Sequence, residues 1–130
     1  MLDYNHDNDS WEPNPPAEFT RFYRAFLDWR RMNRWNNRMA DCLPELFQSQ
    51  GIHCVLVNAN DETVRRGDPD FSAAAAIWIH VVETIGPQLV TAGVLNDQER
   101  IQAECVYRDW VHESLQTQTL QMRTVEGRVP

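Results

Sequence analysis

The N-terminal segment holds the densest group of polar side chains in the chain. Residues 3–9 read Asp-Tyr-Asn-His-Asp-Asn-Asp. Because histidine titrates near neutral pH, His6 could act as a general base or orient a substrate, with the phenol of Tyr4 and the amide of Asn5 beside it. This chemistry would need the segment to follow a strand, since open α/β sheets bind ligands beyond the carboxyl ends of their strands. The alternative is that His6 is an ordinary exposed loop histidine.

The same residues do not predict a metal site. Asp3, Asn5 and Asp7 fit the first three ligand positions of a calcium loop, but Asn8 replaces the turn glycine and Asn14 the final glutamate. The four histidines include no pair with metal-ligand spacing on one element. No serine or cysteine stands in the context of a nucleophile elbow. We therefore expect no bound metal.

Aromatic side chains are plentiful and offer a second kind of chemistry. Five tryptophans could line a pocket: Trp11, Trp29, Trp35, Trp78 and Trp110. Trp29 and Trp78 recur at helical apolar spacing, which favours a place in the core over a place in a binding site.

Composition excludes several classes of protein. The net charge of −7 argues against a protein that binds nucleic acid through its phosphates. All five glycines are isolated, so neither a GxGxxG loop nor a phosphate-binding loop can form, and no cofactor-binding residue is predicted. Lysine is absent, which excludes a Schiff-base mechanism.

The chain reads as a cytoplasmic protein without a membrane segment. The N-terminus has no basic region followed by an apolar one, so no signal peptide is predicted. The longest apolar stretch, residues 73–82, contains His80 and is too short to span a bilayer. The three cysteines are widely spaced, which favours buried, reduced thiols.

The polar and aromatic residues are positioned by elements that the apolar spacing defines. Residues 1–16 read as a strand end and a polar, proline-rich loop. Residues 17–50 read as two cap helices, the first amphipathic over 17–32, and Gly51 follows where a helix C′ glycine belongs. Residues 52–59 form the strongest strand candidate.

The second half is expected to be mostly helical. Residues 61–67 read as a polar loop, and residues 69–115 as inserted helices. We expect Gly86 and Pro87 to interrupt the first of these helices. The last begins at a capping box over 96–99, runs to about residue 115 and carries Ile101, Cys105, Val111 and Leu115 on its apolar face. Residues 118–126 alternate like a half-buried final strand.

This order predicts a single partial domain, residues 1–130, of α/β class. Two full strands far apart in sequence are marginal as an isolated sheet, so the pattern favours the end of a larger sheet.

With that order established, the sequence resembles the C-terminal portion of small-molecule class I S-adenosylmethionine-dependent methyltransferases of the type 11/12 kind. The resemblance spans nearly the whole chain. It is carried by the following segments: Leu2-Asp-Tyr-Asn-His6, Trp11-Glu-Pro-Asn-Pro-Pro-Ala-Glu-Phe19, Phe22-Tyr-Arg-Ala-Phe-Leu-Asp-Trp-Arg30, Asn36-Asn-Arg-Met-Ala-Asp41, Leu43-Pro-Glu-Leu-Phe47, Gly51 and Gly86-Pro-Gln-Leu-Val-Thr-Ala-Gly93.

The resemblance implies a Rossmann-like fold in which a fifth strand ends in a polar loop. A cap helix follows, and the last two strands, about 52–59 and 118–126, form an antiparallel pair with substrate-covering helices between them. The glycine-rich loop that holds S-adenosylmethionine has no counterpart here, so the chain is expected to bind that cofactor weakly or not at all. The resemblance places the substrate pocket at Tyr4, Asn5, His6, Trp11, Tyr23, Trp29 and Arg30.

The sequence thus predicts the substrate side of a methyltransferase for a small-molecule acceptor, inactive without an N-terminal cofactor-binding half. A second hypothesis is a non-catalytic helical module that forms homo-oligomers through its unpaired strands. A third is a small enzyme that uses His6 together with Tyr4.

Overall fold

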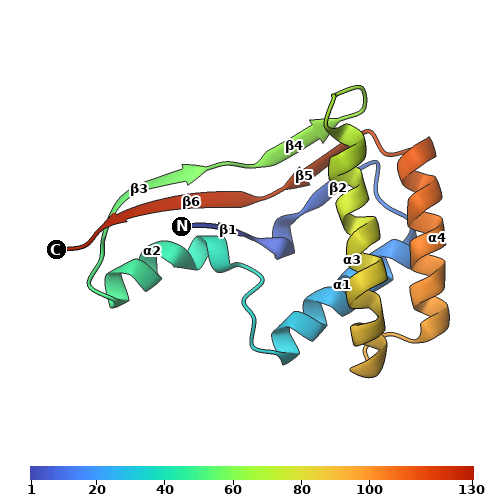
Figure 1. Cartoon of the computed structure of the whole chain (residues 1–130), viewed down its shortest axis with the longest axis horizontal. Helices are drawn as coiled ribbons and strands as arrows, with labels where there is room; N and C mark the ends of the chain where they lie inside the picture. The colour runs from blue at the N-terminus through green and yellow to red at the C-terminus, as the bar shows by residue number, and fades with distance from the viewer. The chain divides into compact units, whose positions relative to one another are not determined.

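A computed structural model describes the backbone of residues 1–130 and all side chains except those of Cys54 and Val55. The chain mixes helices and strands, with two small three-stranded sheets (Figure 1). The elements in chain order are β1 (Leu2–Tyr4), a 3-10 turn (His6–Asn8), β2 (Ser10–Glu12), α1 (Ala17–Met32), α2 (Met39–Ser49), β3 (His53–Ala59), β4 (Glu62–Arg65), α3 (Phe71–Thr91), α4 (Asp97–Glu113), β5 (Thr117–Leu120) and β6 (Met122–Arg128).

The chain divides into two compact units. Unit 1 contains residues 1–10, 36–63 and 119–130, and unit 2 contains residues 11–35 and 64–118. The boundaries between them fall within β2, β4 and β5, the strands of the sheet with order β2-β5-β4.

The other sheet belongs to unit 1 and has the order β1-β6-β3. β6 pairs antiparallel with both neighbours, so β1 and β3 run parallel to each other on either side of the last strand (Figure 1). Thr124 is opposite Leu2 on one side and Asn58 on the other. The antiparallel pair of late strands expected from the sequence is therefore present as β3 and β6.

Helix α2 covers one face of this sheet. Arg123 of β6 reaches Asp41 of α2, with 3.8 Å between Nε and Oδ1. Gly127 lies so close to α2 that an added Cβ would stand 2.6 Å from the ring of Phe47. Because side chains alternate along a strand, the even-numbered residues of β6 and their partners Leu2 and Leu56 lie on the opposite face.

Unit 2 is built from α1, α3 and α4, which pack against one another. Helix α1 has the predicted bounds and buries one apolar stripe, including Phe19 and Phe22 at 0% exposure. Helix α4 begins at the predicted capping box. The Asn96 side chain accepts from the Glu99 N–H, and the Glu99 carboxylate accepts from the Asn96 N–H.

The predicted interruption at Gly86-Pro87 is wrong, because α3 runs unbroken from Phe71 to Thr91. Packing on both sides of the pair explains this: Val82 and Leu89 are both fully buried. Gly86 also allows close approach of α4, since an added Cβ would meet the Arg100 side chain at 2.9 Å.

The uninterrupted α3 is long and apolar enough, by length and composition alone, to cross a membrane, unlike the shorter stretch considered from the sequence. The core helix of a soluble protein meets the same test. Six residues of α3 are buried: Phe71, Ala75, Trp78, Val82, Gly86 and Leu89.

Several local predictions also require correction. The loop expected over residues 5–16 contains β2, and the loop expected over 61–67 contains β4. The single final strand expected over 118–126 is two strands, β5 and β6, which meet at Gln121. Gln121 interrupts the strand because its N–H donates to the Asp9 carboxylate and its carbonyl accepts from the Asn5 N–H.

Helix α4 buries a different face from the one predicted. Ala103, Tyr107 and Trp110 are buried, whereas Ile101 is 51% exposed. The two large aromatic rings remove more apolar surface from water, and they determine which side packs. Cys105 is consequently exposed and Cys42 half-buried, which corrects the expectation of buried thiols; the Cys54 side chain lies outside the described residues.

Candidate functional site

A hydrogen-bonded polar network surrounds the loop after β1 in unit 1. Asn5 is fully buried, and its side-chain amide donates to Asp41 Oδ1 at 2.9 Å and to Gln121 Oε1 at 2.8 Å. The Asn5 side-chain oxygen Oδ1 accepts from the backbone N–H of Asp41 at 3.1 Å. Asn8 donates to the same Gln121 oxygen at 2.8 Å. These hydrogen bonds link the loop to the start of α2 and to the junction of β5 and β6.

His6 lies in this loop beside a buried carboxylate. Its Nδ1 is 3.3 Å from Asp9 Oδ2, and the Asp9 side chain is fully buried while that of His6 is 19% exposed. The ring of Tyr4 stacks on the imidazole, with 5.7 Å between centroids. A carboxylate can only accept, so this contact places the proton of a neutral imidazole on Nδ1 and leaves Nε2 as the acceptor. That tautomer is the one that a general base acting through Nε2 requires.

The electrostatics around the loop keep the Tyr4 phenol neutral and the Asp41 carboxylate ionised. Burial raises the pKa of Tyr4, and the carboxylates of Glu62, Asp9 and Asp3 raise it further, so the phenol stays protonated at neutral pH. Hydrogen bonds from Asn5 and then Arg38 lower the pKa of Asp41, which stays ionised.

Apart from Tyr4, the aromatic site residues predicted from the sequence lie in unit 2, and Trp11, Tyr23 and Trp29 all belong to its buried core. Trp11 and Tyr23 pack edge to face with 5.1 Å between centroids, and both also contact Trp78. Trp11 is 8% exposed, and its indole N–H donates to Gln118 Oε1 at 3.1 Å. The Trp11 and Tyr23 side chains are both buried among other aromatic rings and serve as packing.

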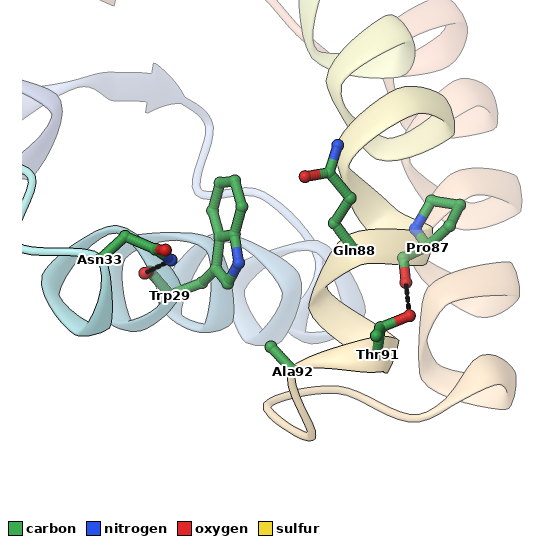
Figure 2. Close-up of a pocket in the computed structure, with 6 residues that line it drawn as sticks. All are labelled: Trp29, Asn33, Pro87, Gln88, Thr91 and Ala92. Atoms are coloured by element: carbon green, nitrogen blue, oxygen red, sulfur yellow. Dashed lines mark hydrogen bonds between the residues drawn. The ribbon is translucent and has the colours of Figure 1, made fainter.

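Trp29 and Arg30 lie at the end of α1, where the structure forms an open hollow of about 440 Å³. The hollow is lined by Trp29, Asn33, Pro87, Gln88, Thr91 and Ala92 (Figure 2). The first two belong to the end of α1 and the others to the end of α3. Figure 2 shows the Trp29 indole and the Gln88 amide standing on opposite sides of the hollow. No lining side chain is ionised.

The predicted site residues therefore fall into two groups. Tyr4, Asn5 and His6 are brought together in unit 1. In unit 2, Trp29 lines the hollow, and the guanidinium of Arg30 lies 5.6 Å from the ring centroid of Trp35 beside it. The residues of each group belong to a single unit.

Sequence reasoning missed the partners that hold these side chains. Asp9 stands three residues after His6, a spacing that suits a local turn, so this contact had a sequence signal. Gln121 and Asp41 had none, since both lie far along the chain from Asn5. Gln88 and Thr91 were missed because the helix was expected to break at Pro87.

The glycines do not fit S-adenosylmethionine. Gly67 is the one glycine that follows a strand and precedes a helix in the part of the chain that the structure describes. Its turn is already closed by the carboxylate of Asp68, whose Oδ2 accepts from the Arg65 N–H at 2.8 Å. The Asp68 carboxylate would repel the carboxylate of S-adenosylmethionine if the cofactor were bound at this turn. No group of three His, Cys, Asp or Glu among the described residues is arranged to hold a metal ion.

Compared with protein-family models and with curated proteins, the sequence matches none.

Proposed function

We propose that this chain is the substrate side of an S-adenosylmethionine-dependent methyltransferase that acts on a small molecule. The methyl donor is held by a separate cofactor-binding part, because the described residues here form no cradle for it. The observation that carries the proposal is the pairing of β3 with β6. These two strands are far apart in sequence, are antiparallel, and have the helices α3 and α4 between them, as the resemblance implies.

The incomplete state of the unit 1 sheet supports this proposal. Within the described residues, β1 is an edge strand with β6 as its one neighbour, so its outer side is open to a further strand. The face opposite α2 carries Leu2 at 49% exposure and Leu56 at 44% exposure. Sheets of α/β proteins are covered on both faces. A sheet with one covered face and one open edge is what we expect of the end of a larger sheet.

In this proposal the chain's own residues bind and orient the acceptor. The hollow beside Trp29, which lies wholly in unit 2, holds the acceptor. S-adenosylmethionine supplies the methyl group when it is bound by the other part. Orientation of the acceptor accounts for much of the rate in such transfers, so these residues act mainly by positioning.

The test is to read the coding sequence directly upstream of Met1 in all three frames for a glycine-rich strand–loop–helix. That segment is then joined to this chain, and S-adenosylmethionine binding is measured by titration calorimetry. We expect one cofactor per joined polypeptide and no measurable heat with the chain alone. Absence of binding by the joined polypeptide would overturn the proposal.

The open edge of β1 also favours a second candidate, a module that forms a homodimer by strand pairing. The N–H of Tyr4 on this edge donates to the Asp3 carboxylate at 2.7 Å, which disfavours the addition of a strand at that residue in both candidates. Size-exclusion chromatography with light scattering separates the two candidates. A stable monomer excludes the homodimer, and a dimer lost in a Leu2→Pro variant would favour it.

A further inference from the structure

The end of α1 has an unusual backbone that shapes one wall of the hollow. Arg34 has φ 60°, in the left-handed region that side chains other than glycine seldom adopt. This conformation lets the N–H of Trp35 donate back to the Arg30 carbonyl at 2.9 Å, and the N–H of Arg34 to the Arg31 carbonyl at 2.9 Å. A glycine would form the same turn without strain. A left-handed residue ends many helices, and strained residues other than glycine also cluster at functional sites.

The strained turn places one tryptophan against another. Trp35 folds back onto α1, and its ring meets that of Trp29 edge to face, with 5.1 Å between centroids. Trp29 is 9% exposed, whereas Trp35 is 48% exposed. The turn therefore holds Trp35 against the indole of Trp29, and this indole forms an aromatic wall of the hollow.

The rest of the lining provides hydrogen-bonding groups without charge. Gln88 is exposed, and its amide offers both a donor and an acceptor to the hollow (Figure 2). Asn33 donates to the Trp29 carbonyl at 2.8 Å, which leaves its own side-chain oxygen as an acceptor. The hydroxyl of Thr91 donates to the Pro87 carbonyl at 3.1 Å and can accept a hydrogen bond.

The lining offers an anion no ionic partner. Both α1 and α3 end beside the hollow, at Met32 and Thr91, and Arg30 and Arg31 in the last turn of α1 offset the partial negative charge of that helix end. Because no lining side chain is cationic, an uncharged group suits the hollow better than an anion. A flat ring suits the indole wall, and a group that both donates and accepts suits the amides and the hydroxyl.

We propose that this hollow binds a flat, uncharged aromatic molecule that carries an amide-type group, and that it excludes the corresponding carboxylate. Resting on the proposed function, the inference assigns the methyl acceptor to this chemical class.

The experiment uses the chain as it stands, without S-adenosylmethionine, and two probes of nearly equal shape, benzamide and benzoate. Titrations are followed in proton–nitrogen NMR spectra through the indole N–H signal of Trp29, which is assigned with a Trp29→Phe variant. We expect benzamide to shift this signal and to bind about tenfold more tightly than benzoate, because the anion has no N–H to donate and finds no cation in the lining.

A matched pair of variants tests the role of the amide. Gln88→Met keeps the length of the side chain and removes its hydrogen-bonding groups, and it should weaken benzamide binding about fivefold, the effect of one hydrogen bond. Gln102→Met makes the same change at an exposed position of α4 outside the hollow and should leave binding unchanged.

Equal affinity for the two probes, shifts confined to other tryptophans, or unchanged binding in Gln88→Met would each overturn the inference. Failure here is distinguishable from failure of the proposed function. The latter depends on cofactor binding by a joined polypeptide, whereas this titration requires no cofactor.

Discussion

Replacing Asn5 with alanine should destabilise unit 1 more than any exposed substitution. The side chain is fully buried and makes three hydrogen bonds, one of them to the ionised Asp41. A hydrogen bond to a charged group contributes about 2 kcal/mol and each of the others about 1 kcal/mol. Asp41 is 36% exposed, so water replaces part of what it loses. We therefore expect a loss of about 3 kcal/mol in the free energy of unfolding.

The pH dependence of this loss follows from Asp41. Its pKa is lowered in the folded chain, first by Asn5 and then by Arg38. A group with a lowered folded pKa contributes stability above its unfolded pKa, about 3.9, and loses it as the pH falls through the folded pKa. Since Asn5→Ala removes the largest cause, the loss should be smaller at pH 3 than at pH 7.

Urea unfolding at the two pH values measures both effects, and the expected loss corresponds to a midpoint about 1–2 M lower at pH 7. Asn60→Ala is the matched control, because Asn60 is exposed and its change should stay within about 0.5 kcal/mol. The reasoning is refuted if Asn5→Ala behaves like the control, or if its effect is the same at pH 3 and pH 7.

Three further changes test other parts of the structure. Arg66→Ala removes three hydrogen bonds to carbonyl groups at the end of α4 and a ring contact, and urea unfolding should show a loss of about 2 kcal/mol that lysine does not restore. Gly127→Ala places a Cβ 2.5 Å from Ile52, and its thermal unfolding should show a loss of about 1–3 kcal/mol; an unchanged melting temperature would contradict the packing of α2 on β6. Nitrogen-15 shifts of His6 should report the Nδ1–H tautomer, and Asp9→Asn should make the two tautomers more equal; a predominant Nε2–H form in the parent chain would contradict the geometry.

Elements with a strong apolar period could be predicted from the sequence. Helix α1 has the predicted bounds because its aromatic residues recur every three or four positions and all pack on one side. Strand β3 and the capping box of α4 were likewise predicted from local chemistry. In each case the local preference and the tertiary packing agree.

The errors arose where packing overrides a local signal. Gly86 and Pro87 disfavour a helix, but the buried Val82 and Leu89 on either side hold α3 together. Gln121 has no local feature that ends a strand, and it does so because three side chains from the β1 loop bind it. Such long-range contacts cannot be read from spacing.

Some residues of the candidate site could be predicted from the sequence, and others could not. His6 and Trp29 stood out by residue type, and the structure gives each a defined environment. Asp9 could have been paired with His6 from its spacing. Gln88 could not have been found, because its place in the hollow depends on the continuity of α3.

The most direct test of the central claim is methyl transfer itself. A glycine-rich segment found by reading the coding sequence upstream of Met1 is joined to the chain, and the joined polypeptide is incubated with S-adenosylmethionine carrying a radiolabelled methyl group and with the low-molecular-weight fraction of a cell extract. We predict that label appears in a small molecule with the joined polypeptide and not with the chain alone. Absence of transfer by the joined polypeptide, or label found only in protein, would contradict the account.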